Sequence, residues 1–180
     1  MDIMVDLETL GQRPGCTILS IGAVAFDPST GEVDSANGFY VVVNRESCEL
    51  HKLEEDQSTK DWWAKQSAAA RKVLDQANDK SKSYDLVEAL DMFGTWMTSL
   101  ASKRQLKMWG NGSDFDNAIL AVCYARAGLP LPWEFWNNRC YRTLKNLVPT
   151  VAMARSGTYH NALDDAISQA QHAVRIFAAM

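Results

Sequence analysis

The sequence predicts an α/β domain in which a mixed central β-sheet is covered by helices. Three strand-like runs come first, and helices that alternate with short strands follow them. The length of 180 residues and the hydrophobic content of 47% suit one globular domain, residues 1–180, with a sizeable core. We therefore expect a single sheet that is packed between helices.

The first predicted strand, residues 3–9, carries two acids. Successive side chains of a strand point to opposite faces, so Met4, Asp6 and Glu8 share one face. Carboxylates that lie so close repel each other unless a cation neutralises them, and Mg²⁺ and Mn²⁺ prefer oxygen ligands. The strand indicates either a metal site or an exposed edge with two solvated acids.

The next segment predicts two further strands. Residues 17–26 form a long apolar run, and the turn sequence at 27–31 leads to a strand at 38–43. Two of the three strands are therefore expected to form a hairpin. The polar segment 44–57 is predicted to be a loop.

Helices are predicted from residue 58 onward. Ser58-Thr-Lys-Asp61 resembles a capping box, which predicts a helix through Gln66 and a further helical stretch to Leu74. A polar linker at 79–84 separates it from a helix at 85–99. The buried face of that helix is predicted to contain Leu86, Leu90, Phe93, Met97 and Leu100.

The C-terminal half alternates short strands with helices. A strand at 105–109 ends in a glycine-rich turn, and the helix at 115–127 is apolar nearly all round, as a buried helix would be. A short strand at 139–142, a short helix at 143–148 and a loop at 150–159 follow. The final helix shows an apolar stripe of Leu163, Ala166, Ile167, Ala170, Val174 and Phe177.

Composition excludes several classes of protein. A net charge of −4 argues against bulk electrostatic coating of duplex nucleic acid. No run approaches the roughly 20 apolar residues of a membrane span, and the first residues lack a signal-peptide pattern, so we expect a cytoplasmic protein without a membrane partner. The cysteines form no C-x-x-C pair and are predicted to be reduced thiols: Cys16, Cys48, Cys123 and Cys140.

Two later stretches carry further acids and a histidine. The stretch from Trp109 to Asn117 runs through glycines into a helix whose first residues include Asp114 and Asp116. The helix macrodipole favours acids there, so a cap and a metal ligand are both open interpretations. His160 stands near the start of the last helix, where a lone histidine is commonly structural or solvated.

Together these stretches resemble the DEDDh group of 3′-to-5′ exonucleases. The resemblance rests on Asp6-x-Glu8, Phe115-Asp116 and His160-x-Ala162-x-x-Asp165-Ala166, whose order and spacing agree with the group over nearly the whole chain. It implies the RNase H-like fold that proofreading exonucleases, RNase T and oligoribonuclease share. The sequence around Trp62-Trp63-x-x-Gln66 is most similar to that of compact RNase T-like exoribonucleases and phage exonucleases.

The resemblance also implies the roles of five side chains. Two ions, Mg²⁺ or Mn²⁺, would be held by Asp6, Glu8, Asp116 and Asp165. His160 would be the general base that takes a proton from the attacking water, a task that suits a side chain titrating near neutral pH. Two metals can serve the attacking and the leaving oxygen of a phosphodiester, which is independent physical support for four carboxylates.

Periodicity alone leaves two of these assignments open. Asp164 and Asp165 lie on opposite flanks of the apolar stripe of the last helix, so geometry cannot choose between them. Asp114 stands in the same relation to Asp116. The family spacing selects Asp165 and Asp116, and a solvated or supporting role is expected for the other two acids.

Substrate contacts are predicted beside the catalytic strand. Thr9 ends this strand and Leu10 follows it, in a region that meets the 3′-terminal nucleotide in similar enzymes. Trp62 or Trp63 can stack on a base. Phe39 and Tyr40 are expected in the core. Arginines that can contact phosphates or remain solvated are Arg13, Arg139, Arg142 and Arg155.

The resemblance thus implies a metal-dependent hydrolase that shortens the 3′ ends of single-stranded nucleic acid, with RNA favoured over DNA, by a two-metal mechanism that releases 5′-monophosphates. A non-catalytic nucleic-acid-binding module on the same fold is one alternative. A single-stranded DNA exonuclease or proofreading subunit is the other. Members of the group are often dimers, so a homodimer is among the expected states.

Overall fold

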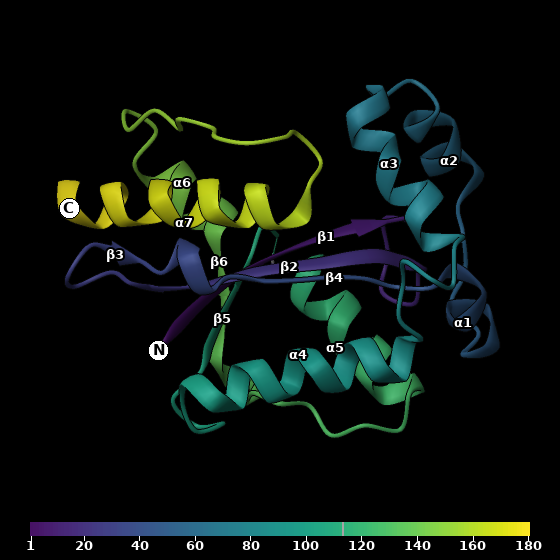
Figure 1. Cartoon of the computed structure of the whole chain (residues 1–180). Helices are drawn as coiled ribbons and strands as arrows, with labels where there is room; N and C mark the ends of the chain where they lie inside the picture. Colours follow the sequence, from purple (N-terminus) through teal and green to yellow (C-terminus); the bar gives the residue numbers. More distant parts are fainter. Residues whose placement is uncertain (113) are drawn as a thin grey trace.

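The computed structural model describes residues 1–112 and 114–180 (Figure 1). Its elements follow one another as β1 (Asp2–Thr9), β2 (Ile18–Asp27), β3 (Glu32–Val33), η1 (Ser35–Asn37), β4 (Phe39–Val42), α1 (Arg45–Leu50), α2 (Gln57–Trp63), α3 (Ala68–Ala77), α4 (Leu86–Leu100), β5 (Lys107–Gly110), α5 (Asp116–Arg126), η2 (Phe135–Asn137), β6 (Asn138–Cys140), α6 (Tyr141–Leu147) and α7 (Ala162–Ala179).

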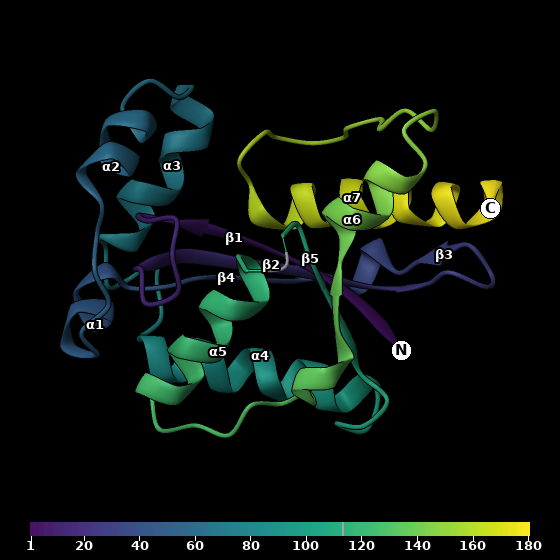
Figure 2. The same ribbon diagram turned by 180° about the vertical axis from the view of Figure 1, so that it is seen from behind.

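A mixed sheet lies between two layers of helices, as predicted. Its strand order is β3-β2-β1-β5-β6, and β4 also pairs with β2. β1 runs antiparallel to β2 and parallel to β5. In Figures 1 and 2, α7 covers one face of the sheet, α4 and α5 cover the other, and α2 and α3 stand at one end.

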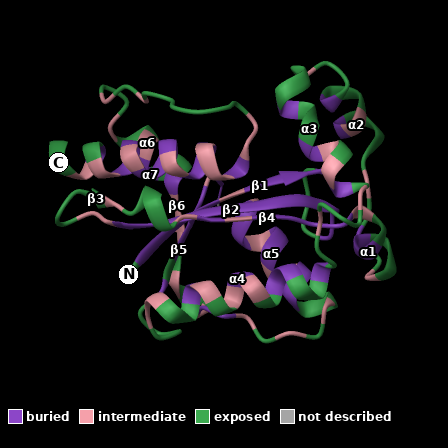
Figure 3. Ribbon diagram, viewed as in Figure 1, coloured by how far each residue is buried: buried purple, intermediate pink, exposed green. Residues whose placement is uncertain are grey.

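The alternation predicted for β1 is confirmed. Ile3, Val5 and Leu7 belong to the core cluster formed with α4 and α5, whereas Met4 packs in the cluster formed with α7. Figure 3 shows that β1 and β2 are buried along most of their length. The two acids of β1 therefore lie on the face that α7 covers.

The segment between β4 and α2 differs from its prediction. It contains the helix α1, because Asn44 Oδ1 caps the helix by accepting a hydrogen bond from the Ser47 N–H (3.1 Å) and Cys48 is buried. β3 was also not predicted. It pairs with the end of β2 through only two residues, too few to produce an alternating pattern.

The helix predicted from Ser58 and the further helical stretch to Leu74 correspond to two helices, α2 and α3. α2 begins at Gln57 and ends at Trp63, and Asp61 accepts a hydrogen bond from the Gln57 side chain (2.8 Å) instead of closing a capping box. α3 begins after Ser67, whose hydroxyl accepts a hydrogen bond from the Ala70 N–H (3.1 Å). The capping box predicted at Ser58 is therefore wrong, and the side-chain cap lies at Ser67, nine residues further along the chain.

The apolar stripe predicted for the last helix is confirmed in part, because Ala166 and Ala170 are fully buried in the core cluster. Leu163, Ile167, Val174 and Phe177 are only half-buried, whereas polar side chains lie on the buried face. These buried polar residues are Asp165, Ser168, Gln169 and His172. The predicted stripe omitted these polar residues because the N-terminal half of α7 packs on the acidic end of β1, where Asp6 accepts a hydrogen bond from Gln169.

The close approach of α7 to the sheet depends on Gly22. This glycine of β2 pairs with Asp6 of β1, and a methyl group added to it would lie 2.1 Å from the carbonyl carbon of Ala162. The absence of a side chain there lets the first turn of α7 lie directly over the strands. Asp165, in that turn, is thereby brought to the acids of β1.

The remaining predictions agree in outline. The helix at 85–99 is α4, the helix at 115–127 is α5, and the short strand and helix near residue 140 are each displaced by one or two residues. The turn before α5 includes residue 113, which lies outside the described residues. The four cysteines are free thiols, and no helix in the described ranges is long and apolar enough to cross a membrane.

Candidate active site

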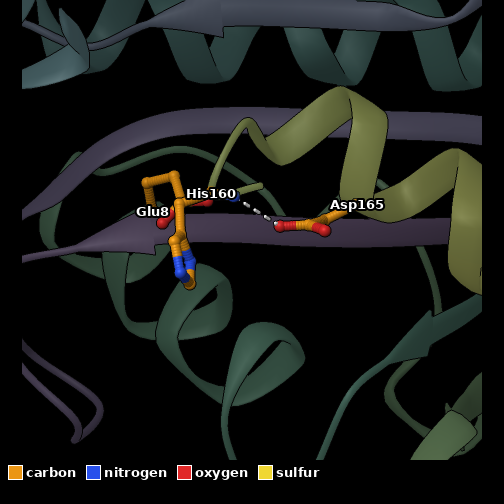
Figure 4. A group of neighbouring side chains, drawn as sticks. All are labelled: Glu8, His160 and Asp165. Atoms are coloured by element: carbon orange, nitrogen blue, oxygen red, sulfur yellow. Dashed lines mark hydrogen bonds between the residues drawn. The ribbon is translucent and has the colours of Figure 1, made fainter. Parts of the chain in front are cut away.

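Three separate segments bring the predicted acids together. Asp6 and Glu8 lie on β1, Asp116 begins α5, and Asp165 lies in the first turn of α7. Figure 4 shows Glu8, His160 and Asp165 grouped at the start of α7. One carboxylate oxygen of Glu8, one of Asp165 and a ring nitrogen of His160 all lie within 4.8 Å of one another.

Asp116 is held rigidly against β1. Its side chain is 1% exposed, and its two oxygens accept hydrogen bonds from the backbone N–H groups of Leu7 (3.2 Å) and Asn111 (2.7 Å). The first bond ties α5 to the strand that carries Asp6 and Glu8. Asp114, the competing acid, is exposed.

Asp6 is held from the opposite side by α7. Its Oδ1 accepts a hydrogen bond from the amide Nε2 of Gln169 (2.7 Å), a side chain that is 3% exposed. The amide oxygen of Gln169, Oε1, is buried and has no hydrogen-bond partner within residues 1–112 and 114–180. A polar side chain on the inner face of α7 was the available sequence signal for this contact, but periodicity assigned that face to other residues.

The choice between Asp164 and Asp165 is visible in the structure. Asp165 is 8% exposed and accepts hydrogen bonds from the His160 N–H (3.1 Å) and from Arg155 (2.5 Å). Asp164 turns away and accepts a hydrogen bond from the Thr158 N–H (2.7 Å). Asp165 therefore faces the other acids, and Asp164 holds the preceding loop.

His160 adopts a left-handed backbone conformation, with φ of 61°. This conformation is uncommon for a residue other than glycine, although histidine is among the residue types enriched in it. The imidazole ring packs edge-on against Trp62, with 4.9 Å between ring centroids. The loop thus places the ring at the rim of the acid cluster instead of in the core.

Burial and mutual repulsion disfavour the charged form of these acids. Burial, followed by the neighbouring carboxylates, holds the pKa of Asp6 well above its usual range and raises that of Glu8 to about 8. Burial raises the pKa of Asp116 to about 6, against the effect of its backbone hydrogen bonds. The pKa of Asp165 is also raised by burial, and Arg155 opposes that rise.

The donor set fits a hard divalent cation. Four carboxylates supply oxygen ligands in a buried site, and their raised pKa values show that positive charge there would stabilise them. The unpartnered amide oxygen of Gln169 is one more oxygen beside Asp6. A thiol-rich zinc site is a poor match, because none of the four free cysteines is in this group.

A cavity of about 190 Å³ opens beside Glu8. It is lined by Leu7, Glu8, Thr9, Gly11, Gln12, Thr59, Trp62, Trp63 and Phe115. Trp62 is 43% exposed at its edge, whereas Trp63 is 1% exposed and donates a hydrogen bond from its indole nitrogen to the Thr9 carbonyl (2.9 Å). Of the two tryptophans, Trp62 is therefore the one whose ring is accessible to a ligand in the cavity.

The other predicted contact residues lie as follows. The Thr9 hydroxyl donates to the Gly11 carbonyl (2.6 Å) at the cavity wall. Leu10 is buried in the cluster with Trp63, and both of its backbone groups are hydrogen-bonded, so it does not line the cavity. Phe39 is in the core as predicted, and Tyr40 is half-buried against the α3 cluster.

The four arginines differ in their surroundings. Arg155 pairs with Asp165, and Arg142 is exposed near Asp116, whose pKa it lowers. Arg139 donates to the backbone carbonyls of Trp136 and Asn138, at the edge of the sheet. Arg13 is exposed in the turn after β1.

Comparison with known proteins gives a family. Residues 1–177 match the model of the family described as 3′-5′ exoribonuclease Rv2179c-like domain. The exodeoxyribonuclease of Enterobacteria phage T4 is 26% identical to the chain over 161 residues, which cover 79% of this chain and 69% of the phage protein.

Solved nucleases have a similar fold. The nuclease domain of 3′hExo, a DEDDh family member whose structure was solved bound to rAMP, matches with a TM-score of 0.62 and 16% identity, covering 99% of this chain and 92% of that one. A full-length 3′-exonuclease matches with a TM-score of 0.57 and 15% identity, covering 99% and 81%. At these identities the solved structures establish the fold, which is the RNase H-like fold that the sequence predicted. The family match shows that the chain belongs to the Rv2179c-like 3′-5′ exoribonuclease domain family and is a 3′-5′ exonuclease.

Proposed function

We propose that the enzyme removes nucleotides one at a time from the 3′ end of single-stranded nucleic acid, prefers RNA to DNA, and releases 5′-monophosphates. The observation that carries this proposal is the grouping of Glu8, His160 and Asp165 within 4.8 Å, with Asp6 and Asp116 close enough for the carboxylates to repel one another. These side chains come from three distant segments of the chain. Repelling charges are costly to bury, so a cation and a phosphate are the groups that such a site is built to receive.

Two divalent ions, Mg²⁺ or Mn²⁺, would be held by Asp6, Glu8, Asp116 and Asp165. Such ions stabilise the charge that develops on the phosphate and on the leaving oxygen, and they ease deprotonation of water. The protein's own contribution is to hold the oxygens in place. The backbone bonds to Asp116 and the Gln169 bond to Asp6 do this from opposite sides.

His160 is assigned the role of general base. One of its ring nitrogens lies within 4.8 Å of carboxylate oxygens of Glu8 and Asp165, close enough for a water between them to give up a proton to the ring. The edge contact with Trp62 and the backbone bond to Asp165 both restrict where the imidazole can lie. The loop therefore presents the base to a water at the acid cluster.

The cavity beside Glu8 is assigned to the terminal nucleoside. The exposed part of Trp62 can stack on a base, which contributes about 1–3 kcal/mol per base and tolerates any sequence. The wall also contains Gln12 and Thr59, polar side chains that can meet sugar hydroxyls. This arrangement supports a site that reads a chain end rather than a sequence.

The preference for RNA rests on relatives. The family description names an exoribonuclease, and the 3′hExo domain was solved with a ribonucleotide. The phage relative is named an exodeoxyribonuclease, which keeps a DNA exonuclease as the second candidate. An exoribonuclease and a DNA exonuclease differ in whether the site recognises the 2′-hydroxyl of the sugar.

The proposal is tested with 5′-labelled RNA and DNA strands of equal sequence, each incubated with Mg²⁺, Mn²⁺ or EDTA. We expect a ladder of shortened RNA with either metal, slower shortening of DNA, and no reaction in EDTA. Faster degradation of DNA would favour the second candidate. Cleavage in EDTA, or cuts in a circular strand, would refute a metal-dependent exonuclease.

A further inference from the structure

Three cationic side chains gather on the α6 side of the acid cluster. Arg142 and Lys145 are three residues apart on α6, so they lie on one face of that helix. Arg155 lies on the loop that connects α6 to α7 and reaches Asp165. We call these three residues the α6 basic cluster.

The cluster borders the site directly. A methyl group at Gly112 would lie 3.8 Å from the guanidinium carbon of Arg142, and this guanidinium lowers the pKa of Asp116. Arg155 donates its hydrogen bond to Asp165. The α6 basic cluster is therefore adjacent to Asp116 and Asp165 of the acid cluster.

The cluster carries positive charge that the protein leaves largely uncompensated. Across residues 1–112 and 114–180, Arg142 and Lys145 make no ion pair, and the Lys145 ammonium lies 5.3 Å from the centre of the Tyr141 ring. Burial, followed by Arg142 and Arg155, lowers the pKa of Lys145, so the three charges repel one another. A polyanion is the ligand that would relieve this repulsion.

The position of the cluster gives the substrate a direction. The cavity assigned to the terminal nucleoside lies on the α2 side of Glu8, whereas the cluster lies beyond Asp116 and Asp165. Figure 2 shows α6 beside α7 and well separated from α2 and α3. A strand whose last nucleoside fills the cavity, with its scissile phosphate at the acids, continues toward α6.

We propose that Arg142 and Lys145, together with Arg155, bind the backbone phosphates upstream of the scissile bond, so that single-stranded nucleic acid leaves the site over α6. This inference rests on the proposed function. Each cation acts on a phosphate and reads no base, which suits an enzyme that shortens strands of any sequence. Arg155 can serve both as a partner of Asp165 before the substrate arrives and as a phosphate ligand afterwards.

The test uses Arg142→Ala, Lys145→Ala and the double variant of the full chain. Arg155 is left intact because it contacts Asp165. Binding of a 5′-fluorescein-labelled 12-nucleotide RNA is measured by anisotropy in EDTA over a range of salt concentrations. Arg104→Ala is the matched control, because Arg104 is an exposed arginine before β5, at the end of that strand opposite Gly110.

Each lost phosphate contact should weaken binding about fivefold at 0.1 M salt and reduce the slope of log affinity against log salt by about 0.7, the value for single strands. In the double variant the slope of log affinity against log salt should fall by about twice that amount. Lys145→Arg keeps the positive charge and should bind the RNA as the wild type does, and so should Arg104→Ala. A wild-type affinity and slope in the double variant would overturn the inference.

A second measurement separates this inference from the proposed function. The p-nitrophenyl ester of thymidine 5′-monophosphate has no upstream nucleotides, so kcat/KM should fall more for the RNA than for this ester in both single variants. Equal losses on both substrates would show a disturbed acid site and overturn the phosphate assignment. Failure of the wild-type enzyme to shorten RNA or DNA with either metal would instead refute the proposed function.

Discussion

Gly22→Ala tests whether the approach of α7 to the sheet assembles the active site. The added methyl group would lie 2.1 Å from the carbonyl carbon of Ala162 and 2.2 Å from the nitrogen of Leu163. Cβ atoms essentially never lie within 3.0 Å of another heavy atom and ordinary contacts begin at 3.4 Å, so α7 and β2 must separate here by about 0.9 to 1.3 Å. Both neighbours are backbone atoms, which cannot rotate away.

The shift has two expected costs. Overpacking of this kind destabilises a protein by about 1–3 kcal/mol. The displaced turn carries Asp165 and follows His160, and a misplacement of about 1 Å can cost about 10²-fold in rate. Gly22→Ala should therefore lower both the melting temperature and kcat, with the larger effect on kcat.

Thermal melts and single-turnover shortening of RNA measure the two effects. Gly94→Ala is the matched control, because a methyl group there meets nothing closer than 3.5 Å and alanine is the better helix former by about 1 kcal/mol. It should raise stability slightly and leave kcat unchanged. A Gly22→Ala protein with wild-type melting and wild-type kcat would refute the proposed role of this close approach.

Three further predictions concern individual side chains. His160→Ala should lower kcat about 10²–10⁴-fold and still bind Mn²⁺ in calorimetry. Asp165→Ala should lose both catalytic activity and Mn²⁺ binding, whereas Asp164→Ala should keep activity and Mn²⁺ affinity within several-fold of the wild type. In EDTA the melting temperature should fall as pH rises from 5 to 9, because Glu8 has a pKa of about 8 when folded and about 4.5 when unfolded, so folding favours its protonated form. Glu8→Gln should reduce this fall. Gln169→Leu removes the donor to a metal-binding carboxylate and should weaken Mn²⁺ binding at least tenfold with little change in fold.

Each of these predictions has an outcome that contradicts it. Loss of Mn²⁺ binding in His160→Ala would make the histidine a ligand rather than a base. A melting temperature that rises with pH in EDTA would mean that the carboxyls are not held in their protonated form. Wild-type Mn²⁺ affinity in Gln169→Leu would show that Asp6 keeps its orientation without that hydrogen bond.

Local patterns in the sequence determined much of this protein. Strand alternation placed Asp6 and Glu8 on one face of β1, and helical periodicity located α4 with its buried residues. Such features depend on side chains a few positions apart, so a single sequence contains them. The order of the three acidic segments, matched to the DEDDh group, indicated the activity before any contact was known.

Tertiary structure decided the parts of the site that depend on distant residues. The hydrogen bond from Gln169 to Asp6 joins residues 163 positions apart, and the bond from Leu7 to Asp116 joins residues 109 positions apart. The first lies on a polar part of the buried face of α7, which a period of apolar residues does not reveal. The second fixes α5 to the catalytic strand.

Trp62 and Trp63 also show which properties local sequence determines and which depend on tertiary structure. Their adjacency in sequence left either one as a base-stacking residue, and only the hydrogen bond of Trp63 to the Thr9 carbonyl, at the end of β1, commits that ring to the interior. Trp62 is left at the edge of the cavity. Local spacing decides which residues can share a face, but whether that face meets solvent, substrate or core depends on what the rest of the chain packs against it.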